Sequence, residues 1–373
     1  MNLELLRCIS MFLIVLSHFA GHGILFQLNY DIGGYEIIRN INTSIAQFFV
    51  FGGNIGVAIF IMMMGYFSLH KNFSFKRILD ISLIIWFYSI SIFVITAIVD
   101  SSVLNIENIV LSFFPLLSSS YWFMTAYLIT YFLSPYYNKL ILSLNKIQLR
   151  KLIIFLSILI MFFPVFGSLD MNHPYSPLFF FLYLIGSWIR LYEREMPLKR
   201  VGKVSFISGL SITLISILIF NGLAIFTNMN FFHFFIWRLF SNFSLPVMMI
   251  AFGLFTWFLS VKKEISTKIT FISSTTLAIY LIHDNFLMRR YLWGTLLRLY
   301  LSINFNFFRF IISAIFYSSV IFFLCVLVEQ LRRKISSLLP LSQELSIKII
   351  NFLSKERPYI FRIKKRIKNL WIS

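Results

Sequence analysis

Long apolar runs follow one another along most of the chain, and short polar connections separate them. An α-helix rises about 1.5 Å per residue, so about 20 residues cross roughly 30 Å of hydrocarbon. Ten runs approach this length, and each predicts a membrane-spanning helix. The predicted spans are residues 3–21, 45–67, 78–99, 121–142, 152–166, 177–191, 204–226, 240–259, 269–286 and 310–331.

A further apolar run, residues 109–117, contains Pro115 and is too short to cross a bilayer. It predicts a re-entrant or interfacial segment. Hydrophobic residues make up 59% of the chain, charged residues 13%, and the mean hydropathy is +0.83. These values lie outside the range of ordinary soluble domains. The predicted fold class is therefore an all-α polytopic integral membrane protein with about ten transmembrane helices.

Positive charge is spread unevenly over the predicted connections. The net charge of +19 does not indicate a nucleic-acid partner, because the cations gather in short connections between spans and in the last 42 residues. The positive-inside rule then places both termini in the cytoplasm. On this orientation only six of the 33 Lys and Arg residues fall outside, and four of these lie in the connection from Arg289 to Arg309. Either those arginines bind anionic lipid or substrate, or one predicted helix there is wrong.

Residues 1–331 form the predicted membrane domain, and residues 332–373 form a basic amphipathic cytoplasmic tail. Seven cations between Lys355 and Lys368 are interspersed with apolar side chains. This pattern predicts a helix on the anionic inner leaflet, with a solvated polybasic tail as the alternative. Cys8 and Cys325 lie in apolar segments far apart, so we expect free thiols and no metal site built on sulfur.

The first predicted helix carries two ionisable side chains on one face. Eleven steps of about 100° bring His18 back to nearly the face of Arg7, about 16 Å further along the helix. Ionisable groups are costly in hydrocarbon, so such a pair predicts a functional site in the bundle interior. Arg7, at the cytoplasmic boundary, suits an anionic phosphate, while a neutral His18 in apolar surroundings suits proton transfer from a hydroxyl. A donor would then arrive from the cytoplasm and an acceptor from outside.

Simpler interpretations exist for each of these residues. His18 could be a hydrogen-bonding group in helix packing, and Arg7 could be an interfacial anchor. His22 follows one turn after His18, and the pair could hold a metal. No Cys, Asp or Glu lies near them on that helix, so we predict no metal and place His22 on the acceptor side.

Three further residues are acceptor-side candidates. His283 and Asp284 end the ninth predicted span at the outer surface, where they could contact sugar hydroxyls. Trp122 fits an outer aromatic belt and could stack on a sugar ring. The ordinary interpretations are a polar helix end and an interfacial anchor.

Several stretches of the sequence resemble the membrane acyltransferase 3 family. The first helix of that family carries an arginine, ten intervening residues and a histidine, which correspond here to Arg7 and His18. The similarity extends to about Glu329, and this pair is its only specific motif. The softer similarities are Gly56 to Phe60 continuing to Gly65 and Tyr66, with Met64 where serine is usual; Tyr121 to Phe123 continuing to Leu133 and Pro135; and Ile279 to His283.

The resemblance implies an enzyme that moves an acyl group, usually acetyl, from a cytoplasmic coenzyme A thioester to a hydroxyl of a cell-surface or lipid-linked polysaccharide at the plasma membrane. It implies that His18 is catalytic and that Arg7 helps to bind the donor. The family often has paired arginines at the start of its third helix. Here Arg77 is followed three residues later by Asp80, and Lys76 is expected to supply part of the missing charge. The implied partners are membrane lipids, acetyl-CoA or another acyl-CoA, and the glycan acceptor, with no metal.

Two other function classes share this composition. A glycan polymerase or flippase would need a large outer catalytic loop, and the only candidate, residues 289–309, is short. A secondary transporter normally shows internal repeats and helices interrupted by Gly or Pro at matching positions. The sequence shows neither internal repeats nor helices interrupted at matching positions, so it favours the acyltransferase.

Overall fold

The chain forms a bundle of α-helices in a computed structural model that describes residues 2–28, 40–161, 176–229, 231–232, 236, 244–262 and 264–338. These parts of the chain contain helices and turns but no strand, which confirms the all-α fold class. The longer helices are α1 (Leu3–Ala20), α3 (Ile41–Ser68), α4 (Phe75–Val99), α6 (Trp122–Ser143), α7 (Lys146–Met161), α9 (Ser176–Tyr192), α10 (Leu198–Thr227), α12 (Leu245–Ser260) and α16 (Phe307–Leu338).

Short helices fill several connections. The predicted non-crossing segment around Pro115 begins as an eight-residue helix, α5, which packs beside α4. The predicted tail begins within α16, which continues to Leu338, and the rest of the tail lies outside the described residues. The short elements are η1 (Gly21–Leu25), η2 (Ser101–Val103), α5 (Ile106–Phe113), η3 (Glu193–Glu195), α13 (Thr267–Ser273), α14 (Thr276–His283), α15 (Phe286–Met288), η4 (Arg289–Leu296) and η5 (Leu299–Asn304).

Five helices among the described residues are long and apolar enough to cross a membrane, and they make the chain a multi-pass membrane protein. They are α1 with its η1 extension, α3, α4, α10 and α16. Predicted spans also coincide with the apolar helices α6, α7, α9 and α12. Residues 162–166 and 240–243, which belong to two of these predicted spans, lie outside the described residues.

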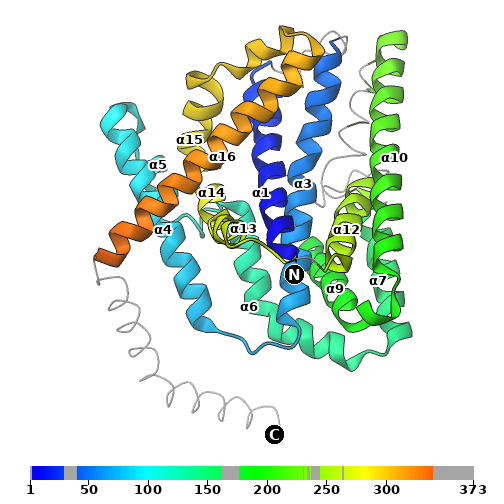
Figure 1. Cartoon of the computed structure of the whole chain (residues 1–373). Coiled ribbons are helices and arrows are strands. Elements are labelled where there is room, and N and C mark those ends of the chain that lie inside the picture. The colour runs from blue at the N-terminus through cyan, green and yellow to red at the C-terminus, as the bar shows by residue number, and fades with distance from the viewer. Residues whose placement is uncertain are drawn as a thin grey trace, which may run out of the picture.

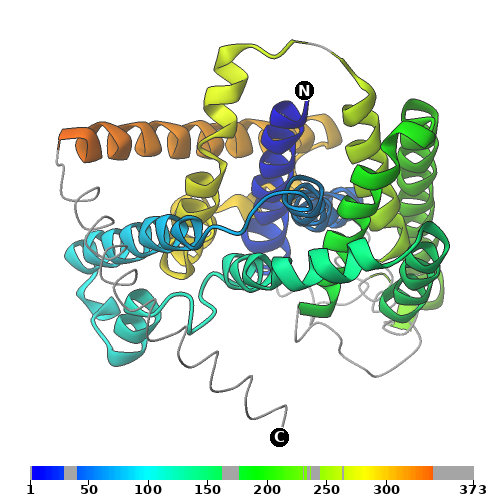
Figure 2. The ribbon, with the colours of Figure 1, turned by 90° about the horizontal axis from the view of Figure 1, so that it is seen from below.

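Helix α1 occupies the centre of the bundle, where it packs along α3 and also contacts α12, α13, α14 and α16 (Figures 1 and 2). Helices α7, α9, α10 and α12 gather on one side of it, α4 and α5 lie on the other, and α16 runs diagonally across. Helices α4, α10 and α16 leave large apolar side chains exposed, as expected for surfaces that face lipid. Helix α1, in contrast, packs against other helices on several sides.

The predicted ninth span, residues 269–286, is not one helix. It is broken into α13 and α14 around Ser274 and Thr275. The Ser274 and Thr275 hydroxyls donate to the carbonyl oxygens of Phe271 (2.7 Å) and Ile272 (2.7 Å). Such bonds compete with the regular helical ladder, and average hydropathy does not register them.

Helix α16 holds this break in place. Arg333 donates to the Ser274 hydroxyl (2.9 Å) and to its carbonyl oxygen (2.7 Å), and the carboxylate of Glu329 accepts from Arg333 (2.7 Å). Glu329 is buried and also bonds Arg332. A charged network thus fixes the segment that carries part of the candidate site.

Two glycines allow α3 and α9 to cross at close range. A Cβ atom on Gly65 would lie 2.1 Å from the Tyr183 carbonyl oxygen, and one on Gly186 would lie 2.0 Å from the Met62 carbonyl oxygen. Small residues commonly permit such approaches between membrane helices. We expect Gly65→Ala to lower the free energy of unfolding by about 1–3 kcal/mol, because backbone must move apart. Thermal unfolding in detergent checks this.

The matched control is Gly222→Ala on α10, where nothing lies within 4 Å of the added Cβ. This substitution removes a flexible residue from a helix interior, so the thermal unfolding midpoint of the variant should equal or exceed that of the parent chain. Equal midpoints for Gly65→Ala and the parent chain would contradict the close crossing.

Candidate active site

Helix α1 and residues 273–284 run side by side in register. Arg7 Nη1 donates to Ser273 Oγ (3.4 Å), and His18 Nδ1 lies 3.5 Å from Asp284 Oδ1. Eleven positions separate Arg7 from His18, and eleven also separate Ser273 from Asp284. The two segments therefore run parallel, and each joins the same two regions of the protein.

Three of the acceptor-side candidates converge on His18. Its ring centroid lies 4.9 Å from that of His22 and 5.0 Å from that of His283, and Asp284 is its charged neighbour. His283 and Asp284 end α14 as predicted, but they do not lie on the protein surface, because they are 0% and 1% exposed. The chain after α14 continues into α15 and η4, whose Trp293 covers the histidine rings.

Arg289 balances the buried charge of Asp284. Its Nε donates to Asp284 Oδ1 at 2.7 Å, and a buried carboxylate without such a partner would be strongly destabilising. Arg289 belongs to the arginine-rich connection at residues 289–309. This arginine pairs with a carboxylate inside the protein. Two contacts hold His283 in place. Its Nδ1 contacts the Ile279 carbonyl oxygen, and Trp293 Nε1 donates to the carbonyl oxygen of His283 (3.2 Å).

Four buried polar atoms in this cluster have no hydrogen-bond partner within the described residues. Buried polar atoms in proteins are nearly always paired, so four without a hydrogen bond in one place mark a candidate functional site. The atoms are His18 Nδ1, His283 Nε2, Asp284 Oδ2 and the Tyr280 hydroxyl oxygen.

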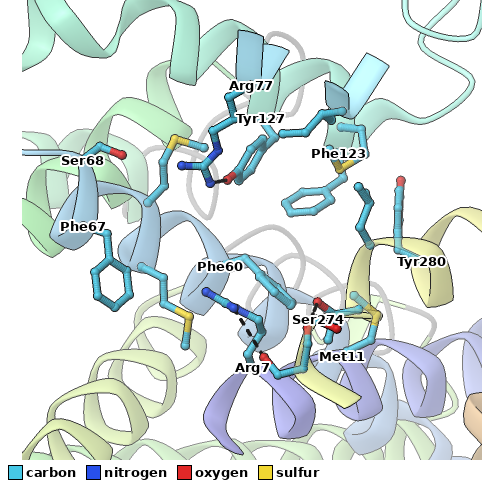
Figure 3. Close-up of a pocket in the computed structure, with 17 residues that line it drawn as sticks. Arg7, Met11, Phe60, Phe67, Ser68, Arg77, Phe123, Tyr127, Ser274 and Tyr280 are labelled. Atoms are coloured by element: carbon cyan, nitrogen blue, oxygen red, sulfur yellow. Dashed lines mark hydrogen bonds between the residues drawn. The ribbon is translucent and has the colours of Figure 1, made fainter. Parts of the chain in front are cut away.

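A cavity of about 260 Å³ lies between α1, α3, α4, α6 and the α13–α14 break. Figure 3 shows Arg7 and Arg77 on different walls of it. Thioether and aromatic side chains form most of the remaining lining, and such walls adapt to flexible ligands. Its methionines are Met11, Met63, Met64 and Met124.

The two arginines of the cavity are held by neutral and acidic partners. Arg7 donates to Glu4 (3.0 Å), and Glu4 also accepts from Ser273. Arg77 donates to the Tyr127 hydroxyl (3.2 Å). Lys76, the third predicted donor-binding residue, is exposed and does not line this cavity.

Tyr280 joins the cavity to the histidine cluster. It lines the cavity, and its ring centroid lies 6.4 Å from that of His283. Sequence analysis missed this role, although Tyr280 precedes His283 by three positions and so shares its helix face. Trp122, the remaining candidate, packs against Phe123 and Phe179.

The arrangement can support transfer of a group between two polar ligands. The cavity offers cations at one end, and the cluster offers a proton acceptor beside a buried carboxylate at the other. The chain matches the model of the acyltransferase domain of the acyltransferase 3 family over residues 2–330. No curated protein and no solved structure matches it.

Proposed function

The chain belongs to the membrane acyltransferase 3 family, and we propose that it moves an acyl group, acetyl by expectation, from cytoplasmic acyl-CoA to a hydroxyl of a cell-surface or lipid-linked polysaccharide. We place it in the plasma membrane. The observation that supports this proposal best is the meeting of a cationic cavity and a His–Asp cluster at Tyr280.

The lining of the cavity supports an acyl-CoA donor as its proposed ligand. Guanidinium groups bind phosphates through paired hydrogen bonds, so Arg7 and Arg77 are the expected contacts of the nucleotide part. The methionine-rich walls suit the flexible pantetheine arm. The thioester would then approach Tyr280, whose hydroxyl can donate to the carbonyl oxygen as negative charge develops there.

His18 is the expected general base. It takes the proton from the acceptor hydroxyl while that oxygen attacks the thioester carbonyl carbon, and the carbon–sulfur bond breaks to release the CoA thiolate. Asp284 orients the imidazole and stabilises its protonated form, as carboxylates do in other His-dependent acyl transfers. Transient acylation of His18, followed by transfer to the hydroxyl, would use the same residues.

Mass spectrometry of surface glycans tests the proposed reaction. Cells that carry the chain should show a mass increase of one acyl group per modified sugar, and cells without it should lack that increase. A change in glycan length with no loss of acyl groups would point instead to a polymerase.

Arg7→Lys tests the donor assignment. Lysine keeps the charge but loses the bidentate geometry, so the KM for acyl-CoA should rise about tenfold or more, with a smaller effect on kcat. The measurement is initial rate against donor concentration with the protein in liposomes. Arg200→Lys, an exposed position on α10, is the control and should leave KM unchanged. An unaltered KM in Arg7→Lys would reduce Arg7 to a membrane anchor.

A further inference from the structure

The His18 cluster contains the donor set of a metal site. One ring nitrogen each from His18 and His22 and one carboxylate oxygen from Asp284 all lie within 4.8 Å of one another. In a tetrahedral zinc site with bonds of about 2.0–2.1 Å, neighbouring ligand atoms are about 3.3 Å apart. Small side-chain rotations would therefore bring the three donors to binding distance. Two histidines and a carboxylate, with a fourth position open, form a known zinc ligand set.

Two atoms of this donor set lack a hydrogen bond within the described residues. Asp284 uses one carboxylate oxygen for Arg289, while its other oxygen, Oδ2, is buried and unpaired. His18 Nδ1 is also buried and makes no hydrogen bond, although it lies 3.5 Å from Asp284 Oδ1. Ligating carboxylates are usually held by a second hydrogen bond, which is the role that Arg289 fills.

The local backbone supports a specialised site. His22 lies in η1, a π-helical segment that begins three residues after His18. Such widened turns are rare and occur frequently at functional sites. Sequence analysis predicted no metal because α1 carries no third ligand near the histidines. The third ligand comes from the end of α14, more than 260 residues away.

We propose that His18, His22 and Asp284 form a binding site for Zn²⁺ or a similar divalent transition metal, and that bound metal inhibits the enzyme. The inhibitory part rests on the proposed function. A metal bound to one nitrogen of His18 leaves the other nitrogen protonated, so the imidazole has no free lone pair for the acceptor proton. The nearby Arg289 charge opposes a cation, so the ion is expected to bind reversibly.

Direct binding tests the site without reference to activity. The metal-free full-length protein in detergent is titrated with Co²⁺, whose visible spectrum reports tetrahedral coordination, and bound Zn²⁺ is counted by elemental mass spectrometry. We expect one ion per chain. His22→Gln should weaken binding at least tenfold, whereas His70→Gln, which changes an exposed histidine on a turn, should not. If both variants bind like the parent chain, or the parent chain binds no ion, the site is refuted.

His22→Cys covers the case in which His22→Gln does not fold. Cysteine is also a zinc ligand, so this variant should retain Co²⁺ binding with the stronger absorption of a thiolate ligand. A folded His22→Cys protein that binds Co²⁺ with the spectrum of the parent chain, without thiolate absorption, would remove His22 from the site.

Inhibition is measured separately. Zn²⁺ should abolish acyl transfer by the parent chain, and EDTA should restore it. Binding without inhibition would overturn the inhibitory part alone. If the metal-free protein shows no acyl transfer, the proposed function fails, while the Co²⁺ spectrum still decides the metal site.

Discussion

Replacing His18 by Gln is expected to lower kcat for acyl transfer about 10²- to 10⁴-fold, the range typical of general-base catalysis. Glutamine is polar and of similar length, but its amide cannot accept a proton at neutral pH. The effect should appear in kcat and not in donor KM, because Arg7 and Arg77 line the cavity and His18 does not. The measurement uses radiolabelled acyl-CoA and a glycan acceptor with the protein in liposomes.

The matched control is His70→Gln, the same chemical change at an exposed position. It should leave kcat and KM unchanged. Size-exclusion chromatography establishes that His18→Gln is folded, which matters because His18 contacts two other histidine rings. A folded His18→Gln protein that keeps full activity would exclude His18 as base and as acyl carrier.

The position of Arg7 and His18 on one face of α1 could be predicted from the sequence, because it depends only on helical periodicity. Eleven steps bring Arg7 and His18 to one side of one helix, and the structure places them at the cavity and at the histidine cluster. The multi-pass helical fold could also be predicted from the sequence, because it follows from the length and composition of the apolar segments.

The partners of these residues could not be predicted, because they come from the opposite end of the chain. Asp284 lies beside His18 after a break between α13 and α14 at a run of hydroxyl residues, and those residues have near-neutral hydropathy. A single straight span was therefore the natural prediction for residues 269–286. The pairing of Arg289 with Asp284 depends on the turn after α14, and no periodic pattern encodes that turn.

The parallel pairing of α1 with residues 273–284 places polar residues at two levels of the protein. Both segments carry a polar residue at the cavity and another at the cluster, eleven positions apart. On a helix this interval is about 16 Å, roughly half of the hydrocarbon thickness. Under the proposed function, a donor at the cavity and an acceptor at the cluster would approach His18 from opposite sides of the membrane.

Asp284→Asn is expected to reduce kcat about 10²- to 10⁴-fold, although Asp284 acts through His18 as a positioning residue. The amide removes the negative charge that stabilises protonated His18, while donor KM should stay the same because the cavity is untouched. Asp284→Glu keeps the charge and should recover part of the rate. Kinetics in liposomes measure both parameters.

A second pair of variants separates this catalytic role from a structural one. Arg289→Gln leaves Asp284 as a buried unpaired charge, which should cost about 3–5 kcal/mol of stability. Asp284→Asn leaves Arg289, whose side chain is 31% exposed, free to turn toward water, so it should cost less. The double variant Asp284→Asn/Arg289→Gln should be more stable than Arg289→Gln and still inactive. Recovery of activity together with stability in the double variant would show that Asp284 only holds the fold.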